Sequence, residues 1–125
     1  MKKILIVEDD RNIAAALAVR LTAAGHEVLT SFDGHEGLLA AVRHQPDLII
    51  SDIWMPAPMG FLGEQRLAVL GLGGVPVIYM TASRKPDLRQ IAEEEGAYAF
   101  FEKPYDPDKL LAAVSQALSE TSVPV

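Results

Sequence analysis

Acidic side chains stand at the ends of two strongly apolar runs of the sequence. Glu8, Asp9 and Asp10 follow the first run, and Asp52 follows another. If the runs are neighbouring buried strands, the carboxylates converge and repel one another unless a cation or a proton intervenes. Asp10 fits better as the cap of a following helix, which leaves Glu8, Asp9 and Asp52. Oxygen ligands in a shallow, partly hydrated site favour Mg²⁺ over a caged Ca²⁺, and zinc is not supported.

Two further apolar runs lead to a hydroxyl group and an ammonium group. Thr81 and Ala82 follow one run, and Lys103 comes shortly after another. A lysine charge, a threonine hydroxyl and a magnesium ion together match the oxygens of a transferring phosphoryl group. An aspartate forms an acyl phosphate when a metal and a lysine neutralise the incoming oxygens, so Asp52 is the candidate nucleophile. Taken alone, Lys103 fits a surface ion pair with a nearby carboxylate better than a functional role, and only its companions favour the functional interpretation.

These side chains need a scaffold that brings strand ends together. Short apolar runs, typical of buried parallel strands, alternate with segments of helical periodicity. The predicted strands are Ile4–Val7, Glu27–Ser31, Leu48–Ile50, Val75–Met80 and Ala99–Phe101. The predicted helices are Ile13–Ala24, Leu38–Val42, Asp87–Glu95, Leu110–Leu118 and, with the weakest signal, the glycine-containing segment Phe61–Leu70. Successive strand–helix units imply an α/β fold, a parallel sheet with helices on both faces, and ligand binding beyond the carboxyl ends of the strands.

Length and composition restrict the class of protein. With 125 residues the chain fits one domain, expected at residues 1–120, followed by a flexible tail at residues 121–125. Half of the residues are apolar and 22% are charged, which indicates a folded globular core. The net charge of −6 disfavours nucleic-acid binding. The absence of cysteine and of a long apolar segment leads us to expect a cytoplasmic protein with no membrane contact.

The ordered motifs resemble the receiver domains of two-component response regulators, and the resemblance spans nearly the whole chain. It is carried by Ile4–Asp10, by Asp47–Pro56 with Gly60, by Pro76–Ala82 and by Gly96–Pro104. Each motif alone is weak, but the ordered set at these separations is specific. The resemblance implies a flavodoxin-like, doubly wound fold with a five-stranded parallel sheet in the order 2-1-3-4-5 and five helices.

By similarity to this family, the acidic residues form a magnesium site beside a phosphoacceptor. The resemblance implies that Asp52 accepts the phosphoryl group and that Asp9 is a direct metal ligand. Glu8 is then a second acidic partner that acts partly through water. The backbone carbonyl of Trp54 completes the protein's share of the coordination.

The resemblance also assigns the phosphoryl-binding and switch residues. Thr81 matches the hydroxyl that bonds the phosphoryl group after transfer, and Ala82 matches the small residue whose backbone amide reaches that group. Lys103 matches the lysine that pairs with the phosphate, and its bond to Pro104 is expected to be cis. Phe100 falls at the aromatic switch position, although a simple core aromatic on the last strand is the alternative interpretation.

The implied function is a phosphorylation switch. The phosphoryl donor would be a phosphohistidine on a sensor histidine kinase or a phosphotransfer protein. The surface of the fourth helix, fifth strand and fifth helix would then change and control an output protein or domain. The chain would catalyse only its own phosphorylation and slow dephosphorylation.

Some residues depart from the family pattern. Met59 stands where an acidic residue is common, and Gly96–Ala99 lacks the acidic pair of receivers that dimerise through the last strand. Trp54 and Ser83 flank the phosphoryl position, and we expect the bulk of Trp54 to slow hydrolysis. Three alternative functions fit the sequence less well. A phosphohydrolase would need a general acid at position 54, a flavin or nucleotide binder would need a less acidic loop, and a phosphorylation-independent interaction module would not need the five polar groups.

Overall fold

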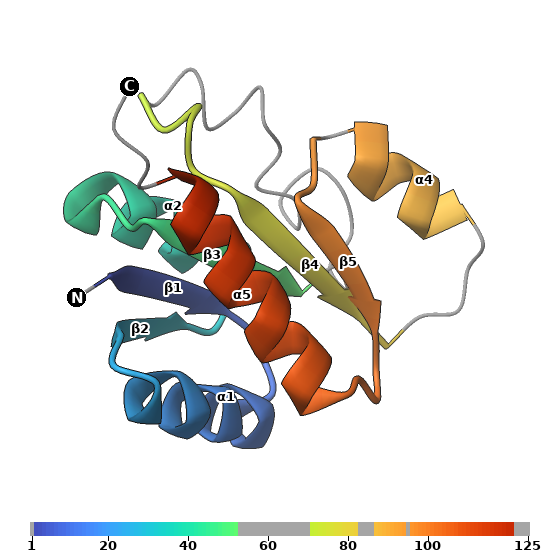
Figure 1. Ribbon diagram of the computed structural model, residues 1–125. Coiled ribbons are helices and arrows are strands. Elements are labelled where there is room, and N and C mark those ends of the chain that lie inside the picture. The colour runs from blue at the N-terminus through green and yellow to red at the C-terminus, as the bar shows by residue number, and fades with distance from the viewer. Residues whose placement is uncertain (1, 53–70, 83–86, 95, 122–125) are drawn as a thin grey trace.

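The computed structural model describes residues 2–52, 71–82, 87–94 and 96–121, and within them five parallel strands form one sheet in the order β2-β1-β3-β4-β5 (Figure 1). The strands are β1 (Lys3–Val7), β2 (Glu27–Ser31), β3 (Leu48–Asp52), β4 (Val77–Thr81) and β5 (Ala99–Glu102). The helices described are α1 (Arg11–Ala23), α2 (Gly34–His44), α4 (Asp87–Glu94) and α5 (Pro107–Thr121). The predicted fold class and strand order are confirmed. The predicted helix Phe61–Leu70 lies outside the described residues.

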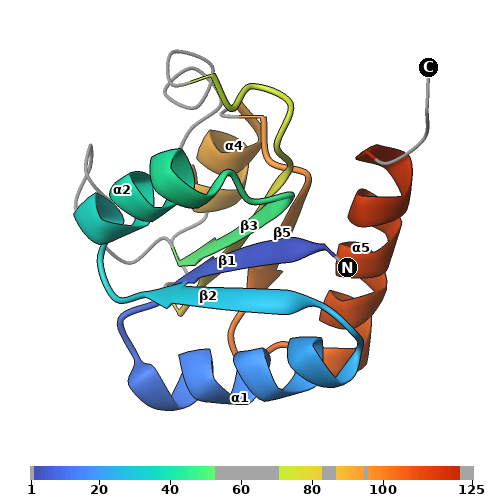
Figure 2. The ribbon, with the colours of Figure 1, turned by 90° about the vertical axis from the view of Figure 1, so that its left-hand side faces the viewer.

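The helices cover both faces of the sheet, and each strand contributes alternate side chains to two cores. Ile4 and Ile6 of β1 face α1 and α5, where they pack with Leu17 and Val114. The intervening Leu5 faces α2 and α4. Figure 2 shows α1 and α2 on opposite sides of the sheet. Burial on both faces explains why the strands are continuous apolar runs instead of alternating patterns. None of the described helices is long and apolar enough to cross a bilayer.

Side-chain caps define where the helices begin. Asp10 Oδ1 accepts hydrogen bonds from the backbone N–H groups of Asn12 at 2.9 Å and Ile13 at 3.2 Å, which satisfies donors that the first turn leaves free. The prediction that Asp10 is a cap is therefore confirmed. Asp33 caps α2 in the same way, through the N–H of Glu36 at 2.8 Å.

The boundaries of β3 and β4 differ from the sequence prediction. β3 continues to Asp52 and β4 to Thr81, so the two polar residues belong to the strands and do not follow them. The backbone ladder continues because its hydrogen bonds do not depend on side-chain polarity. β4 begins two residues later than predicted, because the N–H of Val75 bonds instead to Leu72 and Pro76 has no N–H to offer.

Gly37 brings α2 into close contact with β1. A Cβ atom at this glycine would lie 2.8 Å from Cγ2 of Val7, closer than side-chain carbons approach one another. Val7 is buried and directly precedes Glu8. The absence of a side chain at Gly37 thus allows the helix to pack tightly over the strand that delivers the acidic residues.

Candidate functional site

Three carboxylates converge at the carboxyl edge of the sheet. Glu8 and Asp9 follow β1, and Asp52 ends the adjacent strand β3. One oxygen from each lies within 4.8 Å of the others. Glu8 and Asp52 are buried, whereas Asp9 is exposed to solvent. The site thus consists of two buried carboxylates and one carboxylate that is accessible to solvent.

Glu8 is fixed by both of its carboxylate oxygens. Oε2 accepts a hydrogen bond from the backbone N–H of Asp10 at 3.0 Å, and Oε1 accepts one from Nζ of Lys103. Because Asp10 also begins α1, the turn between β1 and α1 orients the Glu8 side chain. A buried carboxylate with this support is held in one position.

Lys103 joins the last strand to the two buried carboxylates. Its Nζ lies 3.2 Å from Oδ2 of Asp52 as well as bonding to Glu8, and only 12% of its side chain is exposed. Its backbone N–H donates to the carbonyl oxygen of Thr81 at 2.7 Å, and the Lys103–Pro104 bond is cis, as the resemblance implied. The ion pair considered from the sequence is present, but it joins Lys103 to two buried carboxylates and does not lie at the surface.

The electrostatics of the site shift two pKa values. Burial, and after it the neighbouring Glu8 carboxylate, together raise the pKa of Asp52 from 3.8 to about 7, although the Lys103 ammonium partly opposes the change. Burial by itself would lower the pKa of Lys103, but its hydrogen bond to Glu8 and the charges of both carboxylates outweigh burial and raise it. Lys103 therefore stays charged, while Asp52 holds a proton easily unless a further cation enters the site.

The same residues fit a divalent cation. Among the side chains that the structure describes, Oδ1 of Asp52 is the buried polar atom without a hydrogen-bond partner. Three carboxylates and one ammonium leave two negative charges when all are ionised, and every ligand offered is an oxygen. This combination suits Mg²⁺, with Glu8, Asp9 and Asp52 as the residues that would hold it. Trp54, the fourth predicted ligand, lies outside the described residues, as do Ser83 and Met59.

Thr81 and Phe100 lie on the sheet face that α2 and α4 cover. Thr81 ends β4 and is 1% exposed, and Ala82 follows it at the surface. Phe100 pairs in register with Tyr79, two residues before Thr81 on the adjacent strand, and packs half-buried against the core beneath α2 and α4. Side chains two residues apart on a strand share a face, so the hydroxyl and the aromatic ring are on the same side of the sheet.

Two arginines missed by the sequence analysis contact aromatic rings near the site. The guanidinium carbon of Arg89 on α4 lies 4.7 Å from the centre of the Phe100 ring, and that of Arg11 on α1 lies 4.0 Å from the centre of the Phe32 ring. Both distances are within the range of a cation–π interaction. No local signal could have paired them, because each contact joins segments brought together only by the fold.

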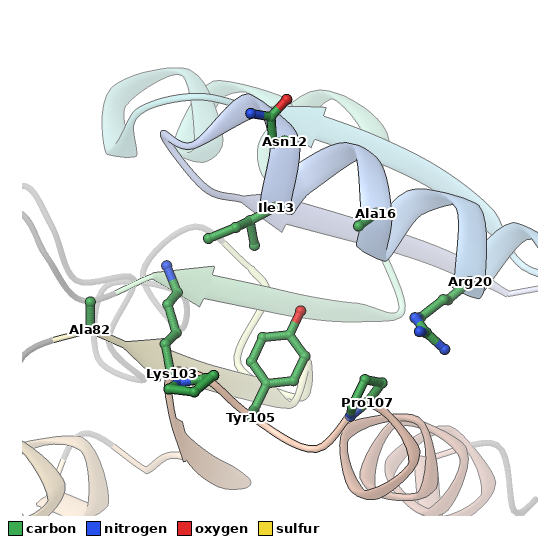
Figure 3. Close-up of a pocket in the computed structure, with 9 residues that line it drawn as sticks. Asn12, Ile13, Ala16, Arg20, Ala82, Lys103, Tyr105 and Pro107 are labelled. Carbon is green, nitrogen blue, oxygen red and sulfur yellow. The ribbon is translucent and has the colours of Figure 1, made fainter.

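A groove of about 610 Å³ opens beside Lys103 and Ala82 and extends between α1 and the start of α5 (Figure 3). Ile13 and Ala16 line it from α1, and the Tyr105 ring lies across from them. The wall is largely apolar, in contrast to the acidic cluster at its end. A macromolecule that approaches the site from this side therefore meets an apolar surface first.

The match to a known family agrees with this geometry. Residues 4–115 match the family model described as the response regulator receiver domain. The chain belongs to the response regulator receiver family. The receiver assignment accounts for the strand order as well as for the acidic edge, because the family model covers both.

Relatives of this receiver include several transcriptional regulators. It is 34% identical to the transcriptional regulatory protein GlrR of Escherichia coli over 95% of this chain and 27% of GlrR. It is 35% identical to the response regulator ArlR of Staphylococcus aureus over 94% of this chain and 53% of ArlR. The chain thus spans between about a quarter and about a half of these proteins.

Solved receiver structures have the same fold. The chemotaxis protein CheY4 of Vibrio cholerae aligns with a TM-score of 0.81 and 31% identity, covering 94% of this chain and 98% of CheY4. The receiver domain of the Francisella response regulator 1452 aligns with a TM-score of 0.86 at 24% identity, over 98% of this chain and 100% of that domain. The second likeness extends to the fold alone.

Proposed function

We propose that this receiver accepts a phosphoryl group on Asp52 from a phosphohistidine of a sensor histidine kinase or phosphotransfer protein. The observation that carries the proposal is the state of the Asp52 carboxylate: Lys103 holds Oδ2, while Oδ1 is buried and unpartnered. The Asp52 carboxylate therefore has one oxygen that can attack phosphorus and a second oxygen that pairs with a positive charge. The proposal places the chain in the cytoplasm, with the ATP that phosphorylates such kinases.

In the transfer, Asp52 acts as a nucleophile in its ionised form and not as a general base. An oxygen of ionised Asp52 attacks phosphorus, the P–N bond of phosphohistidine breaks, and the imidazole leaves with the bonding electrons and takes a proton from water. Glu8, Asp9 and Asp52 would hold Mg²⁺, which would supply positive charge to the phosphoryl group. Lys103, which follows β5, supplies a second positive charge.

Phosphorylation exchanges the partners of the buried network. The new phosphoryl oxygens compete with Glu8 for the Lys103 ammonium and accept hydrogen bonds from the Thr81 hydroxyl and the Ala82 backbone N–H. Movement of Thr81 frees space on its sheet face, into which Phe100 turns. The surface of α4, β5 and α5 then differs between the two states, and an output protein or domain recognises one of them.

The chain acts on itself, so we propose a signalling switch and not an enzyme with an external substrate. It positions the donor, neutralises charge and hydrolyses its own acyl phosphate slowly. The acidic site and the net charge of −6 are unfavourable for direct contact with nucleic acid, and any such binding would belong to an output partner.

The experiment follows the intact mass of the protein during incubation with Mg²⁺ and acetyl phosphate. We expect a gain of one phosphoryl group that requires the metal and is absent in Asp52→Asn. Fluorescence of the single tryptophan, Trp54, should change when Mg²⁺ and then beryllium fluoride are added. A folded wild-type protein that neither gains mass nor responds to Mg²⁺ would contradict the proposal and favour a phosphorylation-independent interaction module.

A further inference from the structure

Arg89 places a positive charge over the ring of Phe100. Its guanidinium carbon lies 4.7 Å from the ring centre, and the rest of the arginine is exposed on α4. The helix itself is anchored by its neighbours: Ala92 is fully buried and Leu88 is partly buried in the core beneath α2 and α4. Arg89 therefore lies on a helix that packs against the core.

We propose that Arg89 is a positioning residue that holds Phe100 in its resting orientation and so sets how readily the receiver switches. This inference rests on the proposed function, because it concerns the equilibrium between the outward and inward positions of the ring. The half-buried ring offers one face to the guanidinium at the surface. An inward turn toward Thr81 withdraws the ring from that charge.

The interaction therefore favours one state. A cation–π contact contributes only when the cation lies within about 6 Å of the ring centre, and it weakens when the ring moves away. A ligand or side chain shifts a two-state equilibrium only by the difference between its interaction free energies in the two states. For a partly exposed pair of this kind, the expected bias is about two- to fivefold toward the resting orientation.

The arrangement also distinguishes Arg89 from other surface arginines. Arg43 is exposed on α2 and contacts no aromatic ring among the cation–π pairs of the described residues. Arg43→Met thus removes the same charge without removing the contact. Arg89→Met keeps an unbranched apolar stem over the ring but removes the cation, and Arg89→Lys keeps a cation of weaker affinity for the ring.

The test labels Phe100 alone with 4-fluorophenylalanine and records the ¹⁹F spectrum during a titration with beryllium fluoride in Mg²⁺. In Arg89→Met we expect the unliganded signal to lie closer to the fluoroberyllate-bound position than in wild type. We also expect the concentration of beryllium fluoride for half-saturation to fall by about two- to fivefold. Arg89→Lys should lie between the two, and Arg43→Met should match wild type.

Different results identify which idea fails. A wild-type protein that responds to beryllium fluoride while Arg89→Met and Arg43→Met titrate identically would overturn the role of Arg89 and leave the proposed function intact. A titration in which binding occurs but the fluorine signal of Phe100 never moves would also overturn it. A folded wild-type protein with no beryllium fluoride response at all would overturn both.

Discussion

Lys103 and Asp52, 51 residues apart in the sequence, face each other across the carboxyl edge of the sheet at 3.2 Å between Nζ and Oδ2. The same ammonium bonds Glu8, so one positive charge serves two buried carboxylates. This shared cation links the stability of the resting protein to the chemistry proposed for it. Any change to Lys103 therefore affects both.

Removal of the shared cation should destabilise the protein. Lys103→Met leaves Glu8 and Asp52 buried without a counter-charge, and we expect a loss of about 3 kcal/mol in the free energy of unfolding in Mg²⁺-free buffer. Urea denaturation measures this difference in the free energy of unfolding. The double variant Lys103→Met/Glu8→Gln should recover part of the loss, and Mg²⁺ should stabilise Lys103→Met more than wild type. Lys109→Met, at an exposed site, is the control, and equal stabilities of the two single variants would contradict the expectation.

The stability of the Mg²⁺-free protein should depend on the ionisation of Asp52. Folding raises the pKa of this carboxyl from 3.8 to about 7, so protonation of Asp52 favours the folded state. This stabilisation is complete below pH 3.8 and is lost as the pH rises through about 7. We expect Asp52→Asn to lack this loss and to exceed wild type by about 1 kcal/mol at pH 8. Urea denaturation at several pH values tests this, with exposed Glu102→Gln as the control. Parallel profiles for wild type and Asp52→Asn would refute it.

The hydroxyl of Thr81 should be needed for switching more than for phosphoryl acceptance. Thr81 ends β4 beside β3, the strand that ends at Asp52, and shares a sheet face with Phe100. We expect Thr81→Ala to gain a phosphoryl group from acetyl phosphate, as measured by intact mass. A fluorine label on Phe100 should not move when this variant is phosphorylated. Thr81→Ser, which keeps the hydroxyl, should retain the movement. A full movement in Thr81→Ala would show that the ring responds by another route.

The groove beside Lys103 should serve the protein donor and not small donors. In the proposed transfer, the phosphohistidine approaches Asp52 from the edge where α1 and the start of α5 border the groove. Ala16→Glu places a charge in the apolar groove at an exposed position, so we expect transfer from a histidine kinase that phosphorylates wild type to slow at least about tenfold. Phosphorylation by acetyl phosphate should be unchanged. Ala15→Glu, on the same helix but outside the groove lining, is the matched control; equal rates for both variants would argue against docking there.

The scaffold was predictable because its signals are local. Burial on both faces makes each central strand a continuous apolar run. A short polar side chain directly before a helical pattern, such as Asp10, marks a cap, because its oxygen reaches N–H groups of the first turn. The strand ends were less predictable. Asp52 and Thr81 continue the backbone hydrogen-bond ladder although their side chains are polar. The pattern of apolar residues therefore does not predict where these two strands end.

The contacts within the site could be predicted only in part. Parallel strand ends share an edge, which was enough to bring Glu8, Asp9 and Asp52 together and to place Lys103 near them. That Glu8 would bond Lys103 directly, or that Arg89 would cover Phe100, depends on rotamers and on how α4 packs. Such details follow from tertiary contacts between segments far apart in the sequence.

In the proposed function, the groove that receives the donor and the contact between Arg89 and Phe100 lie on opposite faces of the sheet. The groove lies along α1 and the start of α5, whereas Phe100 and Arg89 lie under and on α4, across the sheet. Substitutions that alter donor recognition can therefore accumulate on one face without changing the resting balance of the switch on the other. A lineage of such proteins can acquire new upstream partners while its downstream threshold stays the same, and the threshold can be retuned by single changes on α4.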